Sequence, residues 1–126
     1  MSAGTHRIES LNAVTLGVAD MARAAAFYAA AGFEREYGGA DAEFTSYRLG
    51  PNHLNLMRVP LGEQHGSWGR VVVYVADVDA TYAHMVAAGL TPEFAPRDAN
   101  WGERYFHLRD PDGHELSFAR LLVETD

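Results

Sequence analysis

The sequence predicts an α+β fold in which two copies of a βαβββ module wrap around one shared cavity. Three observations predict it. The same succession of an apolar run, an Asp, an alanine-rich stretch and a Gly occurs twice, alternating apolar residues mark strands, and capping residues stand at both ends of two predicted helices. The 126 residues, 48% of them hydrophobic, suit one compact domain. We expect module one at about residues 8–58, a linker at about 59–69 and module two at about 70–122.

The repeat lies in the order of these signals more than in residue identity. Equivalent residues lie 57 positions apart early in each module and 62 positions apart later. The pairs are Val14 and Val71, Val18 and Val75, Ala19 and Ala76, Asp20 and Asp77, Gly32 and Gly89, then Phe44 and Phe106, Leu54 and Leu116, and Leu56 and Phe118. The second copy therefore holds five more residues, which we place in the loop Pro96–Trp101.

Module one begins with a strand, because Val14, Leu16 and Val18 alternate with smaller or polar residues. Asp20 can cap the helix that follows, and Gly32 stands where a left-handed residue ends it. Three strand-like runs then lead to the end of the module, with a turn at Gly50–Asn52 between the last two. These runs are Glu34–Tyr37, Phe44–Leu49 and Leu54–Arg58.

Module two repeats this order. Alternation at Val71, Val73 and Val75 predicts its first strand. Either Asp77 or Asp79 begins the helix, Gly89 ends it, and Pro92 prevents its continuation. The three strand-like runs are Thr91–Phe94, Arg104–Leu108 and Leu116–Arg120, with a turn at Asp110–Gly113 between the last two.

Strand alternation assigns the side chains to two faces. The residues expected under the helices are Val14, Leu16, Val18, Leu54, Leu56, Val71, Val73, Val75, Leu116 and Phe118. Those expected on the opposite face are Ala13, Thr15, His53, Asn55, Met57, Arg70, Val72, Tyr74, Tyr105, His107, Glu115 and Ser117. This second face is polar and chargeable, yet too apolar for open water, so we expect it to form a cavity or an interface.

The composition limits the kinds of partner and the compartment that we expect for this protein. The formal net charge of −7 repels nucleic-acid phosphates and anionic lipid, so we expect neither as a partner. The chain has no cysteine, which excludes disulfides and thiolate metal sites and fits a reducing compartment. The first ten residues lack the apolar core of a signal peptide, and the apolar run Ala24–Ala31 is too short to span a bilayer. We therefore expect a cytoplasmic protein.

Three stretches make the sequence similar to a known family. They are VTLGVADMARAAAFYAAAGF, VVVYVADVDATYAHMVAAGL and YFHLRDPDGHELSF. Together they resemble the vicinal oxygen chelate superfamily, which includes glyoxalases, bleomycin-resistance proteins and extradiol dioxygenases. The resemblance runs from about Ile8 to Leu121. It implies two four-stranded half-barrels beside a pocket, and it implies a homodimer, since members are often dimers.

The resemblance also implies where a divalent metal would bind. Its metal-dependent members place a His near the start of the first strand of each module and a Glu on the last. The matching positions here are Ala13, Arg70, Asn55 and Ser117. Alanine offers no lone pair and arginine is a fixed cation, so this set predicts a protein without a metal.

A shifted metal set is the alternative. His53, His107 and Glu115 share the cavity face and would suit iron or another divalent ion. The competing interpretation is that all three are polar lining residues and that Glu115 neutralises Arg70. Arg70 in turn either anchors a carboxylate or phosphate of a ligand or only pairs with Glu115.

The remaining aromatic and histidine residues carry weaker signals. We expect Trp101 to contact ligand or act in a lid, and Trp68 to fill a loop or a dimer contact. We expect Tyr47, Tyr74 and Tyr105 either to pack within the fold or to orient a ligand with their hydroxyls. We expect surface or loop positions, without a role, for four histidines: His6, His65, His84 and His114.

The sequence therefore predicts a metal-free protein that sequesters or senses a small, partly aromatic or acidic molecule. The expected ligand-binding residues are Arg70, His53, Asn55, Tyr74, Trp101, Tyr105, His107, Glu115 and Ser117. One rival is an enzyme, either a lyase or dioxygenase with the shifted metal set or a metal-free isomerase or lyase using His53 or Glu115 as general base. The other rival is a dimer surface without any ligand.

Overall fold

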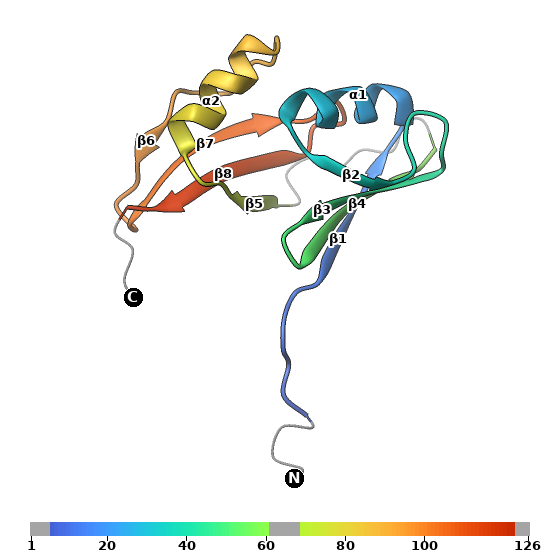
Figure 1. The fold of residues 1–126 in the computed structure, drawn as a ribbon, viewed down its shortest axis with the longest axis horizontal. Helices are drawn as coiled ribbons and strands as arrows, with labels where there is room; N and C mark the ends of the chain where they lie inside the picture. The colour runs from blue at the N-terminus through green and yellow to red at the C-terminus, as the bar shows by residue number, and fades with distance from the viewer. Residues whose placement is uncertain (1–5, 61–68, 123–126) are drawn as a thin grey trace.

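The computed structural model describes residues 6–60 and 69–122, and these form two βαβββ modules, as predicted (Figure 1). Module one contains β1 (Ala13–Val18), α1 (Met21–Ala31), β2 (Glu34–Tyr37), β3 (Phe44–Leu49) and β4 (Asn52–Arg58). Module two contains β5 (Arg70–Tyr74), α2 (Val78–Ala87), β6 (Arg97–Asp98), β7 (Glu103–Arg109) and β8 (Glu115–Leu121). Most of the predicted linker, with Trp68 and His65, lies outside the described residues.

Each module folds into its own four-stranded sheet. The strand orders are β1-β4-β3-β2 and β5-β8-β7-β6. In both sheets the first strand runs parallel to the last and the remaining pairs are antiparallel. The two helices lie on one side of the sheets (Figure 1). Because each sheet is covered by a helix on one side, its other side is left to bind something else.

The predicted caps set the helix ends. The Asp20 carboxylate accepts a hydrogen bond of 3.1 Å from the Arg23 N–H, and Gly32 ends α1 with φ at 100°. In module two the capping residue is Asp77, whose carboxylate accepts from Ala80 N–H at 2.9 Å. Neither helix in the described part of the chain is long and apolar enough to cross a membrane.

The core follows the predicted alternation. The ten residues expected under the helices all belong to the buried cluster or pack against it. Side chains of both modules meet there: the Phe33 and Phe118 rings lie edge to face, 6.2 Å apart. Burial of this shared apolar surface is the main force that holds the two sheets together.

Hydrogen bonds between the two modules fix how they pack against each other. The β7–β8 turn of module two docks on the end of β1 and the start of α1. The Tyr28 hydroxyl donates to Asp110 at 2.8 Å, and Asp112 accepts from Ala19 N–H at 2.9 Å. His114 Nε2 lies 2.8 Å from the Gly17 carbonyl oxygen. Since Asp110 is only 5% exposed, this turn is part of the interior.

His114 lies in a loop, as expected, but the expectation of a surface position was wrong. It is only 2% exposed and reaches module one. The error has a physical cause, because a residue next to a turn is solvated only if nothing docks on that turn. His84 is exposed as expected, but it lies 3.1 Å from the Ala30 carbonyl oxygen of α1.

The predicted strand Thr91–Phe94 was also wrong. The strand that pairs with β7 here is the short β6, and the earlier segment contributes a single bond from Glu93 N–H to the His107 carbonyl oxygen, at 2.8 Å. Pro92 lies within this segment and Pro96 follows it. Proline has no N–H to give to a ladder, so a continuous strand cannot form there.

The equivalence of Phe44 and Phe106 was wrong by one residue. Phe106 is fully buried, whereas Phe44 is 37% exposed on the opposite face of its sheet. Tyr47 pairs across the strands with Leu54, seven positions later in the sequence. In module two, Leu108 pairs with Leu116, eight positions later. The turn of module two is thus one residue longer, and a shift of one position reverses every side chain of a strand.

Two buried tyrosines offer a matched stability test. The Tyr28 hydroxyl bonds to Asp110, while the Tyr47 hydroxyl has no hydrogen-bond partner among the described residues. We expect Tyr28→Phe to lower the free energy of unfolding by ~1–3 kcal/mol, because it removes a donor from a buried carboxylate. We expect Tyr47→Phe to leave it unchanged or raise it by about 1 kcal/mol. Urea denaturation followed by circular dichroism measures both; equal losses would contradict the assignment.

Candidate functional site

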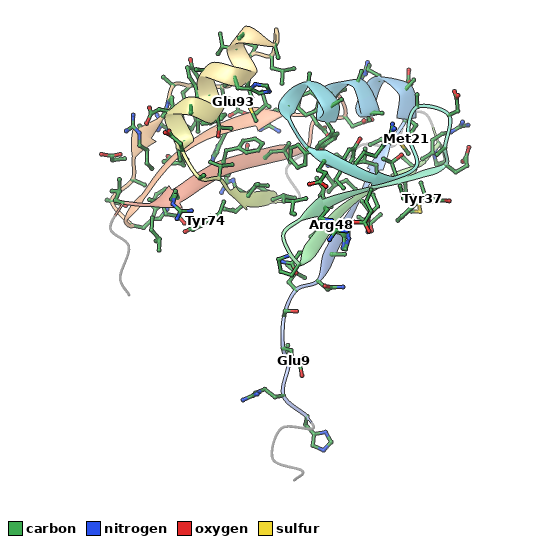
Figure 2. All side chains as sticks on the ribbon, in the orientation of Figure 1. Glu9, Met21, Tyr37, Arg48, Tyr74 and Glu93 are labelled. Carbon is green, nitrogen blue, oxygen red and sulfur yellow. The ribbon has the colours of Figure 1, made fainter. Side chains whose placement is uncertain are left out.

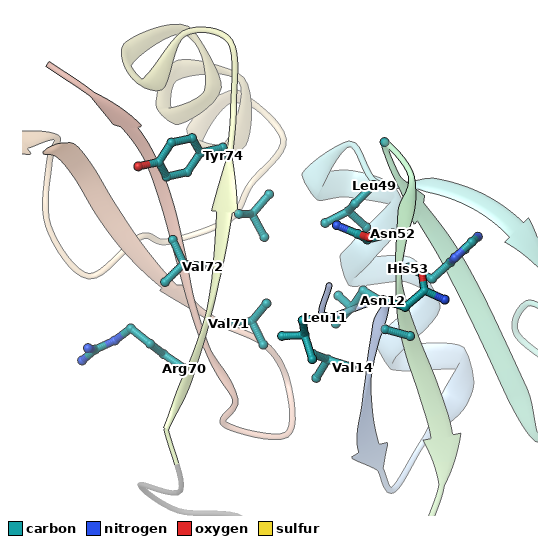
Figure 3. A pocket seen from close by; sticks show the side chains of 14 residues that line it. Leu11, Asn12, Val14, Leu49, Asn52, His53, Arg70, Val71, Val72 and Tyr74 are labelled. Carbon is teal, nitrogen blue, oxygen red and sulfur yellow. The ribbon is translucent and has the colours of Figure 1, made fainter. Parts of the chain in front are cut away.

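The uncovered face of module two carries three rows of side chains across β7, β8 and β5. Strand pairing sets the members of each row. The charged row is Arg109, Glu115 and Arg70; the middle row is His107, Ser117 and Val72; the aromatic row is Tyr105, Ala119 and Tyr74. Figure 3 shows Arg70, Val72 and Tyr74 on one side of β5, with Val71 on the other. The face therefore changes from charged to aromatic along its strands.

Module one has a matching face with fewer charges. Its rows, across β3, β4 and β1, are Arg48, His53 and Ala13, then Ser46, Asn55 and Thr15, then Phe44, Met57 and Gly17. His53 Nε2 lies 3.0 Å from Glu36, and the Asn55 amide donates to the Thr15 hydroxyl at 3.4 Å. Both faces thus run from charged through polar to apolar, as equivalent strands of a repeat should.

The charged row of module two is an ion network around Glu115. Its carboxylate accepts from Arg70 Nε at 2.5 Å and from Arg109 Nη2 at 3.0 Å. His107 Nδ1 lies 3.3 Å from the same carboxylate, and Arg109 Nε lies 3.0 Å from Glu93. The Glu115 side chain is only 11% exposed, so these partners replace most of its water.

This network sets the protonation states. Burial alone would raise the pKa of Glu115, but the Arg70 hydrogen bond and the charges of His107, Arg70 and Arg109 hold that pKa below its ordinary value. Burial lowers the pKa of His107, and the charges of Arg70 and Arg97 lower it further, against the opposite effect of Glu115 and Glu93. At neutral pH Glu115 is therefore a carboxylate and His107 a neutral imidazole.

An aromatic stripe runs along β7 beside this network. The Trp101 ring lies 5.4 Å from Tyr105, which lies 5.2 Å from His107. Phe94 lies 5.1 Å from His107 and carries the Arg97 guanidinium 3.7 Å above its own ring. Trp101 remains 64% exposed. The stripe therefore offers planar rings to anything that lies over the middle row.

Glu103 holds two of these aromatic side chains. Its carboxylate accepts from Trp101 Nε1 at 3.0 Å and from the Tyr74 hydroxyl. The hydrogen bond to Glu103 raises the pKa of Tyr74, so this hydroxyl stays protonated. Glu103 thus fixes one ring on β5 and one beside β7, on either side of Ala119.

A hollow of about 730 Å³ lies between the edge strands of the two sheets (Figure 3). Its lining includes Leu11, His53, Arg70 and Val71. Residues of both modules line it. His53 and Asn55 otherwise belong to the face of module one, while the other seven predicted ligand residues lie on or beside the face of module two.

Comparison with known proteins agrees with this architecture. Residues 10–118 match the model of the glyoxalase/bleomycin resistance protein/dioxygenase superfamily. The chain belongs to this superfamily. An uncharacterized protein of Mycobacterium bovis is 38% identical over 52 residues, which cover 41% of this chain and 34% of that protein. The match thus spans about a third of the relative's length.

Solved structures share the fold. TioX from a Micromonospora species has a TM-score of 0.72 at 25% identity and covers 90% of this chain and 100% of its own. A bleomycin-binding protein, solved in complex with bleomycin, has a TM-score of 0.72 at 24% identity and covers 90% and 98%. A superfamily member from Nocardioides has a TM-score of 0.72 at 19% identity and covers 98% and 91%.

The residues at the implied metal positions of the superfamily do not fit a cation. Arg70 and Ser117 lie on the face of module two, and Ala13 and Asn55 on that of module one. Arg70 places its positive charge within the site and pairs with Glu115. A divalent ion prefers carboxylate or neutral imidazole ligands, and these four positions supply neither.

The three residues of the shifted metal set do not come together within one chain. His107 and Glu115 lie together, but the third member of the cluster that the described residues form is Glu93, and His53 lies beside Glu36. The potential ligand atoms of Glu93, His107 and Glu115 all lie within 4.8 Å of one another. However, two arginines balance the two carboxylates, so this cluster has no net negative charge to attract a cation.

Sequence reasoning missed Glu93, Glu103, Arg109 and Phe94. Glu103 and Arg109 share the alternation of Tyr105 and His107 on β7, so extending that strand by one residue at each end would have found both. Glu93 and Phe94 lie in a segment outside the strands, and their place beside His107 follows only from how that segment folds back.

The network predicts a linked change of two pKa values. Arg70→Ala removes a charge that lowers the pKa of both Glu115 and His107, so both should rise. In the wild type, protonation of His107 favours the unfolded chain, so stability falls as pH drops below the ordinary histidine pKa of about 6.5. NMR titration of the His107 ring measures the change. Arg58→Ala, on the far module, is the control; an unchanged His107 pKa in Arg70→Ala would contradict the network.

Proposed function

We propose that this protein binds a small planar molecule with an acidic group, without a metal ion, on the face of module two. The observation that carries the proposal is the order of the rows, which places a guanidinium at one end and aromatic rings at the other. A sequestering or resistance role needs no chemistry beyond such binding.

Arg70 supports the acidic end of the ligand. It pairs with Glu115 through Nε, and among the described residues no acceptor holds the two terminal amino groups of its guanidinium. The side chain is 52% exposed, so a ligand can reach it. A planar guanidinium edge matches a carboxylate or phosphate oxygen pair. Arg109, by contrast, already uses its nitrogens on Glu93, Gly113 and Glu115.

The aromatic row supports the planar end. Tyr105 and Tyr74 flank Ala119, which is only 1% exposed, so a ligand would contact the rings beside it. Trp101 extends this surface and is 64% exposed. Exposed rings of this kind can stack on a flat ligand.

A structural relative supports a sequestering role. The bleomycin-binding protein holds its ligand on the same fold. At 24% identity that likeness shows the fold alone, and the binding role is carried to this chain as a proposal. We also propose that the protein acts in the cytoplasm as a homodimer, in which a second copy covers the open sheet faces.

A second candidate function is acid–base catalysis, and one observation favours it. His107 is neutral, lies next to the Glu115 carboxylate through Nδ1, and faces the open side of the sheet with its ring between Phe94 and Tyr105. A carboxylate-oriented imidazole can accept a proton from a bound substrate. His107 would then be the base of a metal-free isomerase or lyase, in place of His53 or Glu115.

Calorimetric titration tests the binding proposal. The probes are 4-hydroxybenzoate, indole-3-acetate and metal-free bleomycin, with 4-hydroxybenzamide as a neutral counterpart. We expect Arg70→Ala to weaken an acidic probe about tenfold or more, because a charge-assisted hydrogen bond is lost, and to leave the amide unaffected. Trp101→Ala should weaken both. Val86→Ala, on the exposed surface of α2, is the control. Equal binding to wild type and Arg70→Ala would sink the proposal.

Metal analysis tests the other half of the proposal. Protein purified without chelators and titrated with Zn²⁺, Fe²⁺, Ni²⁺ or Mn²⁺ should hold far less than one ion per chain, since guanidiniums occupy the acceptor atoms. Elemental analysis and calorimetry give the stoichiometry. A full equivalent of bound metal would overturn the metal-free assignment. Its loss in both His53→Ala and His107→Ala would support the shifted set, and its loss in His107→Ala alone would point to the cluster of Glu93, His107 and Glu115.

A further inference from the structure

The aromatic row on the face of module two continues to an arginine at the edge of the sheet. Arg97 on β6 pairs with Tyr105 on β7, and residues that are directly opposite in an antiparallel pair share one face. The Arg97 Nε donates to the Tyr105 hydroxyl at 3.3 Å, which agrees with this placement. Figure 2 shows Tyr74, at the other end of the row, on the side of the sheet that α2 leaves uncovered. From β6 to β5 the row therefore reads Arg97, Tyr105, Ala119 and Tyr74.

Two aromatic rings hold the Arg97 guanidinium in place. Its central carbon lies 3.7 Å from the centre of the Phe94 ring and 5.6 Å from the centre of the Tyr105 ring. Both distances are typical of a cation–π contact. Phe94 is itself packed against the hydrophobic core. A guanidinium stacked on a fixed ring loses less conformational freedom on binding an anion than an unsupported side chain does.

Arg97 has no counterion within the described part of the chain. Its contacts there are with rings and a hydroxyl, and no carboxylate pairs with it. Asp98, the next residue, pairs instead with Arg104 on β7. Carboxylates are not scarce, since the chain holds 17 acidic and 10 basic residues. The terminal amino groups of Arg97 are therefore available to an anion that comes from outside the chain.

The acidic side chains on or beside this face already have donors of their own. Glu103 accepts from the Trp101 indole with one oxygen and from the Tyr74 hydroxyl with the other. Glu93 pairs with Arg109 at 3.0 Å. Neither carboxylate therefore neutralises the guanidinium at the end of the aromatic row.

Arg70 and Arg97 stand at opposite corners of the same face. Arg70 belongs to the charged row on β5, and Arg97 to the aromatic row on β6. These strands form the two edges of the sheet, about 14 Å apart, and the two rows lie about 13 Å apart along the strands. Each side chain bonds to a residue of the adjoining inner strand, Glu115 or Tyr105, so both guanidiniums reach toward the middle of the face.

His107 lies in the middle row between these corners. Burial lowers the pKa of His107, and the charges of Arg70 and Arg97 lower it further, so both cations act on the centre of the face. The His107 and Tyr105 rings lie 5.2 Å apart there. A flat ligand placed over these two rings would extend toward a guanidinium at each end.

We propose that Arg97 is a second anion-binding residue, so that the preferred ligand is a flat molecule with an acidic group at each end. Arg70 holds one of these groups and Arg97 the other. This inference rests on the proposed binding function and deepens it, because it names the class of ligand. Arg97 determines specificity in this arrangement, since a ligand with one acidic group leaves one of the two guanidiniums unused.

Calorimetric titration with three naphthalene acids tests the proposal. The probes are naphthalene-2,6-dicarboxylate, its 2,3-isomer with adjacent carboxylates, and the monoacid 2-naphthoate. We expect wild type to bind the 2,6-isomer about tenfold or more tightly than either other probe, because only this isomer can reach both guanidiniums. Arg97→Gln should reduce that advantage to about twofold or less, and Arg97→Lys, which keeps the charge, should restore part of it.

Arg58→Gln is the matched control, because Arg58 is an exposed arginine of module one. It should leave the preference for the 2,6-isomer unchanged. A 2,6-isomer that binds no better than 2-naphthoate, or a preference that survives Arg97→Gln, would overturn the inference. If 2-naphthoate binds through Arg70 and the second acidic group adds nothing, the role of Arg97 fails and the proposed function stands. If none of the three probes binds, both fail.

Discussion

The buried hydrogen bond between Tyr28 and Asp110 ties the two modules of this protein together. Tyr28 comes from α1 of module one and Asp110 from the β7–β8 turn of module two. The same carboxylate accepts from the N–H groups of Asp112 and His114, which shapes the turn. Loss of the Tyr28 donor would therefore affect both the docking of the modules and the turn that docks. The position of this turn on module one therefore depends on the contact.

The charges on the face of module two follow from an arginine at a position where the resemblance implies a metal-binding histidine. Where the superfamily resemblance implies a metal-binding imidazole, this chain has Arg70, and the nearby Glu115 serves as its counterion. A fixed cation does part of what a metal would do, since it attracts an anionic group and lowers the pKa of its neighbours. It cannot polarise a ligand as a Lewis acid, so binding is the simpler use of such a face.

The two open faces offer different side chains. Each face carries its own graded rows, and residues of both modules line the hollow between β1 and β5. His53 and Asn55 lie on the sheet of module one, whereas the other predicted ligand residues lie on or beside the sheet of module two.

The sequence by itself determined the duplicated architecture, the helix caps and the inward side of β1, β4, β5 and β8, because these depend on local periodicity and on capping groups near in the chain. Only the tertiary structure decided which polar residues come together. Glu93 joined the network through the fold of a segment interrupted by prolines, and His114 became buried because a turn docks on another module. His53 stays apart from Glu115 because the open faces of the two modules belong to separate sheets. Local signals fix conformation over a few residues, whereas a site is made by contacts between segments distant in the chain, and these depend on how the modules pack.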